Sequence, residues 1–134
     1  MIDFHSHILP GADHGSDNLS MSLSQLEYAR DAGVSIIVAT PHFYPDSDNI
    51  PDFIRRREKA YDELCNANTS EIKIVKAAEV RLGINLDKEP ELRKLCIGET
   101  DYILIEFDFF KPSFEDVSTW CSYLKSFGLV PIIA

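Results

Sequence analysis

The feature that most constrains the fold is a regular alternation of short apolar segments with segments of helical periodicity. Five apolar segments are predicted to be strands, namely residues 1–5, 34–40, 71–79, 102–107 and 129–134. Segments with helical spacing lie between them. Four βα units followed by a fifth strand predict an α/β fold, in which the strands pair in parallel through right-handed crossovers.

The first two helices are predicted from their apolar spacing and their ends. Leu19, Leu23 and Leu26 recur at helical spacing, with Asp17 as the expected N-cap and Gly33 suited to the C′ position. The second helix is expected to begin within residues 48–51, because a proline is tolerated in a first turn. The residues that share one face of this helix are Phe53, Arg57, Tyr61 and Leu64, and those interpreted as a solvated face are Arg55, Arg56 and Arg57.

Two further helices are predicted in the second half of the chain. Asp87 is expected to cap a short helix whose Leu92 and Leu95 face inward. Ser113 and Asp116 have the spacing of a capping box at the start of the last helix. The residues that recur at helical spacing along this last helix are Phe114, Val117, Cys121 and Leu124.

Composition and charge exclude several classes of protein. With 13 Lys and Arg against 22 Asp and Glu, the net charge is −9, which argues against nucleic-acid binding. No apolar run approaches the roughly 20 residues needed to span a bilayer, and the start of the chain lacks the features of a signal peptide. We therefore expect a cytoplasmic protein without membrane insertion. Cys65, Cys96 and Cys121 form no C-x-x-C pair and are expected to be reduced, buried thiols.

No repeat or linker divides the sequence, so residues 1–134 are predicted to form a single domain. The chain stops on an apolar strand that no helix follows, which would leave an edge uncovered. Because a typical (β/α) barrel needs about 250 residues, we expect a domain truncated at its C-terminal end. Two such domains could bury their edges against each other, so a homo-oligomer is one interpretation.

Histidines and glutamates gather where the predicted strands end. His5 and His7 leave the first strand, His42 follows the second, Glu79 ends the third and Glu106 ends the fourth. The carboxyl ends of parallel strands share one rim, so these side chains are expected to converge.

These residue types in this pattern favour a metal site. His5 and His7 are two residues apart, so on an extended backbone both rings point to the same side. Taken alone, they could equally be two surface histidines. Glu106 lies in an apolar segment, where a carboxylate is costly unless it is hydrogen-bonded, paired with a cation such as Arg81, or bound to a metal. Mixed imidazole and carboxylate ligands suit Zn, Mn or Fe better than Ca or Mg.

At these residues the sequence resembles the polymerase and histidinol phosphatase (PHP) superfamily. It is more closely similar to the CpsB/CapC-type bacterial protein-tyrosine phosphatases of capsule and exopolysaccharide operons. The matching segments are residues 1–11, Gly15 with its acidic neighbours, and residues 39–42, 78–79, 102–107 and 130–134. The resemblance implies a PHP-type (β/α) barrel related to the TIM barrel, about half of which is present as four βα units and a fifth strand. It also implies up to three ions, with Mn²⁺ expected and Fe or Zn as alternatives.

The resemblance further implies a role for each residue of the rim. His5 and His7 would bind one ion, Glu79 would bridge two ions, Glu106 would bind the second ion and His42 the third. No catalytic residue is implied beyond the metal ligands.

The loop after the first strand departs from the family pattern. Where relatives carry Asp-Asp-Gly, this chain has Asp13, His14 and Gly15. His14 would therefore replace a carboxylate ligand, with Asp13 as the alternative. A His-Pro-Glu-Arg-like motif and a later Asp-x-His, which supply further ligands in the family, are absent from these 134 residues.

The activity that the resemblance implies is metal-dependent hydrolysis of phosphotyrosine on a partner protein, a bacterial tyrosine kinase. Metal-bound water would attack the phosphorus in line, so no cysteine nucleophile is needed. Two alternatives stay open at this point. One is a small-molecule phosphoesterase such as a histidinol phosphatase, and the other is an inactive metal-binding fragment that self-associates.

Overall fold

The computed structural model describes residues 1–83, 85–86, 91–107 and 113–134. The strands in this part of the chain are β1 (Ile2–Ser6), β2 (Ile36–Ala39), β3 (His42–Phe43), β4 (Lys73–Lys76), β5 (Glu79–Arg81), β6 (Tyr102–Glu106) and β7 (Val130–Ile133). The helices are α1 (Leu19–Asp31), α2 (Ile50–Ala67), the short 3₁₀ helix η2 (Leu92–Leu95) and α3 (Phe114–Ser126).

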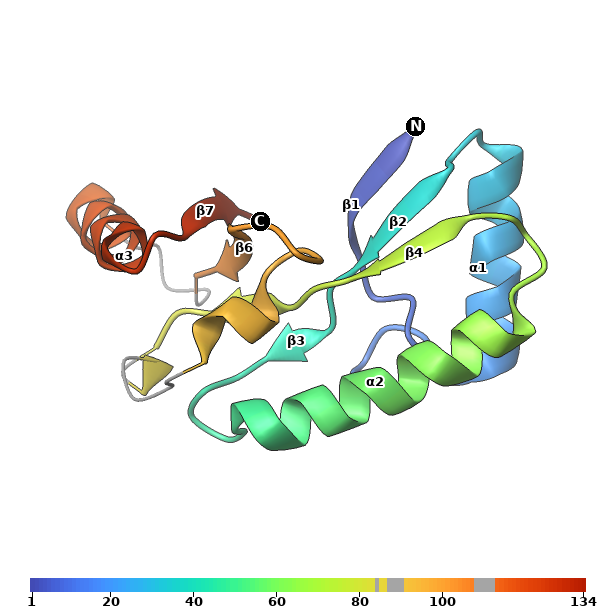
Figure 1. Ribbon diagram of the computed structural model, residues 1–134, viewed down its shortest axis with the longest axis horizontal. Helices are drawn as coiled ribbons and strands as arrows, with labels where there is room; N and C mark the ends of the chain where they lie inside the picture. The colour runs from blue at the N-terminus through green and yellow to red at the C-terminus, as the bar shows by residue number, and fades with distance from the viewer. Residues whose placement is uncertain (84, 87–90, 108–112) are drawn as a thin grey trace.

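Every pairing between these strands is parallel, which confirms the predicted α/β fold. The strands form one sheet in the order β1-β2-β4 and a second in the order β3-β5-β6-β7. In Figure 1 the first sheet lies beside α1, and β6 and β7 lie beside α3 at the other end of the molecule. Within each sheet, the strands lie side by side in the order in which they occur along the chain.

One predicted strand is divided in the structure, and one is followed by an additional short strand. The predicted strand 34–40 contains β2, which ends at Ala39, and the unpredicted strand β3 begins after Pro41. The segment 71–79 is divided into β4 and the start of β5. The two sheets stay connected at the breaks, because the Ala77 amide donates to the Ala39 carbonyl at 2.9 Å and the Glu79 amide to the Pro41 carbonyl at 3.1 Å.

The interruption has local causes. Pro41 has no N–H to donate to a ladder. Across from it, the Ala77 carbonyl accepts from the Arg57 guanidinium at 3.1 Å, and the Ala78 amide donates to the Leu95 carbonyl at 3.1 Å. Glu79 therefore begins β5 instead of ending a strand. His42 follows β2 as predicted and also begins β3, where it is the register partner of Glu79.

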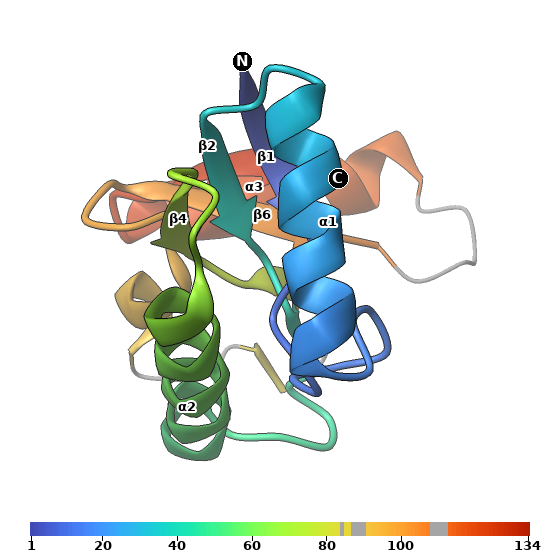
Figure 2. The ribbon, with the colours of Figure 1, turned by 90° about the vertical axis from the view of Figure 1, so that its right-hand side faces the viewer.

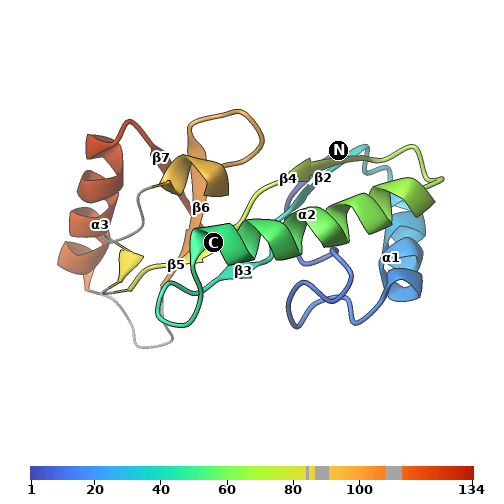
Figure 3. The same ribbon diagram turned by 60° about the horizontal axis from the view of Figure 1, so that its bottom comes forward.

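Helix α2 holds the two sheets together. Its Phe53 packs in a core with Phe43 and Val80, whereas Leu64 belongs to a second core with Ile37, and all five side chains are buried. Figure 2 shows α1 and α2 on the same side of the β1-β2-β4 sheet, and Figure 3 shows α2 running from the region of β3 to α1. The site described below lies where these two packed units meet.

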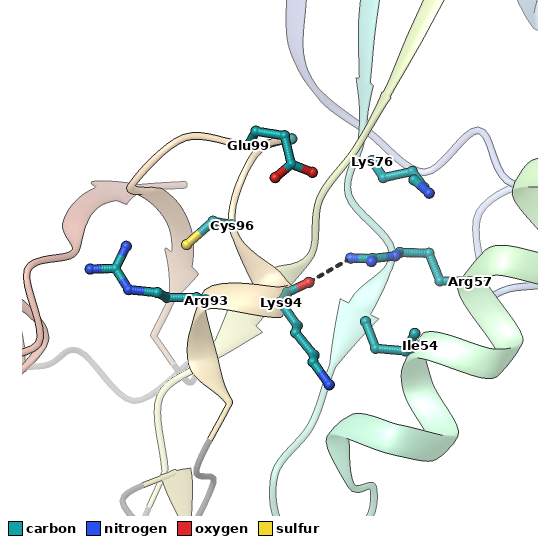
Figure 4. Close-up of a pocket in the computed structure, with 8 residues that line it drawn as sticks. Ile54, Arg57, Lys76, Arg93, Lys94, Cys96 and Glu99 are labelled. Atoms are coloured by element: carbon teal, nitrogen blue, oxygen red, sulfur yellow. Dashed lines mark hydrogen bonds between the residues drawn. The ribbon is translucent and has the colours of Figure 1, made fainter.

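Arg57 corrects the prediction that residues 55–57 form a solvated face. Its side chain is only 7% exposed and donates to the carbonyls of Ala77 and Lys94. Figure 4 shows this guanidinium reaching from α2 toward η2 across a cavity of about 370 Å³. The helical spacing that placed Arg57 with Phe53 and Leu64 was the better guide. The burial of Arg57 is tolerated because Nη1 and Nη2 donate hydrogen bonds to the two carbonyls and to Glu58.

The helix ends agree with the predictions in part. Asn18, and not Asp17, caps α1 by accepting from the Met21 amide. The capping box of Ser113 and Asp116 is confirmed. Asp87 lies outside the described residues.

Side-chain positions also differ in places from the predicted pattern. Leu92 and Leu95 are buried as expected, but Phe114 is 88% exposed, since it occupies the first position of α3, beyond the part of the helix that packs. All three cysteines are free, although only Cys96 is fully buried. Among the described residues, no helix combines the length and the apolar character that crossing a bilayer requires.

Candidate metal centre

Five predicted rim residues meet at one site, where the rings of three histidines approach a single atom, the Oε2 oxygen of Glu79. It lies 3.0 Å from Nε2 of His5, 3.1 Å from Nε2 of His7 and 3.2 Å from Nδ1 of His42. The fifth residue, Glu106, is reached through His42, whose Nδ1 is 3.2 Å from Oε1 of Glu106. The residues come from β1 and the loop after it, β3, β5 and β6.

The first strand is shaped to bring two of these residues together. Asp3 pairs with Ile37 and Ser6 with Ala39, so β1 has one residue more than β2 over this stretch. Such a bulge bends a strand and redirects its side chains, and bulges are frequent next to active sites. The rings of His5 and His7 consequently face each other, with their Nε2 atoms 3.2 Å apart.

The unsatisfied polar atoms test whether a cation fits here. Glu79 Oε2 and His42 Nδ1 are buried and have no hydrogen-bond partner, because their close contacts lack hydrogen-bond geometry. A buried polar atom without a partner costs about 1–3 kcal/mol, more if it is charged. Two imidazole nitrogens and a carboxylate oxygen that face one another are the donor set of a transition-metal or zinc site. The residues present therefore fit a bound divalent cation.

In the part of the chain that the structure describes, three groups of ligand atoms lie close enough to share an ion, each with its atoms within 4.8 Å of one another. The groups are His5, His7 and Glu79, then His42, Glu79 and Glu106, and finally His7, Asp13 and His42. Glu79 belongs to two of them, which is the geometry that a bridging carboxylate needs. The individual ligand roles remain predictions.

The loop residue that enters these groups is Asp13, not His14. The ring of His14 does lie at the site, with its centroid 4.6 Å from that of His42 and 5.8 Å from that of His7. Asp13 instead accepts hydrogen bonds from His7 and from the backbone of His42. Burial tends to raise the pKa of the Asp13 carboxyl, but hydrogen bonds from His7, Gly15 and His42 lower it to about 2.

The electrostatics of the site follow from its crowded carboxylates and histidines. Hydrogen bonding to Asp13 raises the pKa of His7 above its usual value. Burial raises the pKa of Glu106, and the nearby charge of Glu79 acts in the same direction. Both shifts have the same origin, because crowded carboxylates disfavour further negative charge and favour positive charge, and such a site is suited to cations.

Sequence reasoning did not single out Tyr44, which lies against the site. Its ring stacks on that of His42 at a centroid distance of 5.0 Å, and the Arg81 guanidinium lies 5.5 Å from the Tyr44 ring centre. The signal was available, because a residue two positions after His42 points to the same side of an extended chain. The stacked ring restricts the orientation of the His42 imidazole.

Comparison with known proteins shows similarity to phosphatases of capsule synthesis. The family model described as capsular polysaccharide synthesis, CpsB/CapC, matches residues 1–134. The tyrosine-protein phosphatase YwqE of Bacillus subtilis (strain 168) is 29% identical over 137 residues, covering 100% of this chain and 53% of that protein. The tyrosine-protein phosphatase CpsB of Streptococcus agalactiae serotype V is 29% identical over 136 residues, covering 100% of this chain and 56% of that protein.

A solved structure is similar as well. It comes from a crystallographic study of YwqE from Bacillus subtilis and CpsB from Streptococcus pneumoniae, described there as unique metal-dependent tyrosine phosphatases. It matches with a TM-score of 0.78 and 27% sequence identity over 99% of this chain and 54% of that one. The chain thus spans about half the length of the curated relatives it matches.

Proposed function

The chain belongs to the CpsB/CapC family of capsular polysaccharide synthesis, and from this premise we propose that it forms the metal-binding part of a protein-tyrosine phosphatase. Its substrate is proposed to be the phosphotyrosine of a bacterial tyrosine kinase that controls capsule or exopolysaccharide synthesis, and its location the cytoplasm. The observation that carries the proposal is the convergence of His5, His7 and His42 on the buried, unsatisfied Oε2 of Glu79.

Each residue of the centre has a proposed task. His5, His7 and Glu79 hold one cation, Glu79 and Glu106 hold a second, and His42 holds the third. His14, whose ring contacts those of His7 and His42, is the proposed additional ligand from the loop. Mn²⁺ is the proposed metal, with Fe or Zn as alternatives, in a centre of up to three ions.

When bound, divalent cations supply an activated water and neutralise phosphate oxygens. The chain's own residues hold the site in place for that chemistry. Glu79 is buried between the buried residues Ala78 and Val80, which holds its carboxylate in place. The stacked ring of Tyr44 restricts the plane of the His42 ring. The acidic and imidazole side chains would bind the cations. The positive charge that attracts a phosphate would then come from the cations and not from basic side chains.

The proposed architecture is a PHP-type (β/α) barrel, of which residues 1–134 supply about half as one domain. Its support is the order of the strands, since within each sheet they are parallel and lie in chain order, as the strands of such a barrel do. Association of two copies remains a prediction.

The phosphatase assay that tests the proposal uses the purified chain with a phosphotyrosine peptide and, in parallel, histidinol phosphate, each with Mn²⁺ or with chelator. Turnover of the peptide that chelator abolishes supports the proposal, and turnover of histidinol phosphate alone favours the small-molecule alternative. Peptide turnover that is indifferent to chelator contradicts it. Mn²⁺ binding without turnover of either substrate would show that this chain is an inactive metal-binding fragment.

A further inference from the structure

We propose that Asp13 is a positioning residue of the metal centre, which fixes the His7 ring with Nε2 toward Glu79, and that it is not itself a metal ligand. The inference rests on the proposed function only in so far as that function requires a metal centre. Asp13 lies with His7 and His42 in a group of possible ligand atoms, which would suggest that it binds a metal ion. The proposal instead assigns it the role of orienting His7.

The hydrogen bonds of Asp13 occupy the oxygen that faces the site. Oδ2 accepts from the Nδ1 atom of His7 at 2.7 Å and from the backbone amide of His42 at 2.9 Å. Oδ1 accepts from the backbone amide of Gly15 at 2.9 Å. With its side chain only 7% exposed, Asp13 has both lone pairs of Oδ2 engaged. A cation could reach Oδ2 only by displacing one of these donors.

The bond to Asp13 decides what the other nitrogen of His7 can do. A carboxylate only accepts, so Nδ1 of His7 carries the proton, and Nε2 of the neutral ring keeps its lone pair. That Nε2 is the atom 3.1 Å from Glu79 Oε2 and 3.2 Å from His5 Nε2. Without Asp13, the proton could move to Nε2, where it would block a metal ion. Mutation of a carboxylate that holds a ligating histidine in this way typically lowers metal affinity by about 10–100-fold.

The loop that carries Asp13 is shaped to reach His7. A Cβ atom on Gly15 would lie 2.3 Å from both Cβ and the carbonyl oxygen of His7, so only glycine allows this approach. The Ser16 amide donates to the His7 carbonyl at 3.0 Å, which fixes the loop against the end of β1. Through His42, the same carboxylate also holds the start of β3. Asp13 therefore connects the loop to two elements that bear predicted ligands.

The first experiment measures the tautomer of His7 in the metal-free chain by long-range ¹H–¹⁵N NMR at alkaline pH, where imidazoles are neutral. We expect the Nδ1–H form in the wild-type chain and loss of its predominance in Asp13→Ala. The control, Asp17→Asn, changes an exposed charge in the same loop and should leave the tautomer unchanged. A wild-type His7 protonated at Nε2, or an unchanged tautomer in Asp13→Ala, would overturn the proposal.

The second experiment measures Mn²⁺ binding by calorimetry to the wild type, Asp13→Asn, Asp13→Ala and Asp17→Asn. We expect the same number of ions in all four, with affinity about 10–100-fold lower in Asp13→Ala. Asp13→Asn is nearly the same size and keeps one acceptor oxygen, so its loss of affinity should be smaller. Loss of one ion per chain in Asp13→Asn, with the remaining affinity unchanged, would identify Asp13 as a ligand.

The two readouts separate this inference from the proposed function. A wild-type chain that binds no Mn²⁺ would contradict the proposed metal centre. The tautomer of His7 in the metal-free chain would still decide whether Asp13 positions that ring.

Discussion

Glu79 and His42 begin two neighbouring strands as register partners, and their side chains meet with Oε2 3.2 Å from Nδ1 while neither atom makes a hydrogen bond. Two polar atoms that are buried together without hydrogen-bond geometry destabilise a fold unless a ligand compensates for them. The start of these two strands therefore coincides with the proposed metal centre. A substitution of Glu79 is expected to affect the stability of the metal-free chain and the affinity for metal in different ways.

Glu79→Gln is expected to leave the metal-free chain as stable as the wild type, or more stable by about 1 kcal/mol. The reason is that the substitution removes a buried carboxylate that lacks a hydrogen-bond partner at Oε2. Urea unfolding in the presence of chelator measures the effect, with the exposed Glu63→Gln on α2 as the control. A loss of several kcal/mol in Glu79→Gln would mean that the carboxylate stabilises the fold by itself.

Arg57→Met is expected to lower the free energy of unfolding by about 2–4 kcal/mol. It would leave the carbonyls of Ala77 and Lys94 without the charged donor that reaches them inside the protein. Arg55→Met, at an exposed position of the same helix, should change stability by no more than about 0.5 kcal/mol. Equal effects of the two substitutions in urea unfolding would contradict a structural role for the buried guanidinium.

Gly15→Ala is expected to destabilise the chain by about 1–3 kcal/mol and to weaken Mn²⁺ binding, because the new methyl group would overlap His7. Gly33→Ala is the matched comparison. Its φ of +82° makes alanine strained there, at about 1–2 kcal/mol, but a Cβ would meet no atom within 4 Å. Metal binding should survive in Gly33→Ala, and its retention in Gly15→Ala as well would show that the loop does not shape the centre.

The stability of the metal-free chain should depend on Asp13 at acidic pH. Its pKa is lowered from 3.8 to about 2, so its stabilising contribution is complete above 3.8 and is lost as the pH falls toward about 2. Urea unfolding in chelator at a series of pH values measures this loss. Asp13→Asn should show a shallower decline across that window, and an identical decline would contradict the assigned hydrogen bonds.

The rim of the site could be predicted from sequence because it follows from the topology of the strands. Parallel strands bring their carboxyl ends to one edge, so His5, His7 and Glu106 could be placed together once the strands were recognised. The break between β4 and β5 could not be predicted. It involves Arg57, which lies far from Ala77 along the chain yet donates to its carbonyl.

Local choices between similar neighbours were also beyond sequence reasoning. Asp17 and Asn18 are both good N-cap residues, and only the path of the loop decides that Asn18 caps α1. Asp13 and His14 are equally close to the site along the chain. The hydrogen bonds of Asp13 to His7 and His42, which distinguish the two, become visible only in three dimensions.

The most direct test of the central claim is calorimetric titration of Mn²⁺ into the metal-free chain and its Glu79→Gln and Glu63→Gln variants. Since even residues that only support a ligand change affinity by about 10–100-fold, loss of the shared ligand Glu79 should exceed about 100-fold. Glu63→Gln should bind as the wild type does. Equal Mn²⁺ affinity in all three chains would contradict a metal centre built around Glu79.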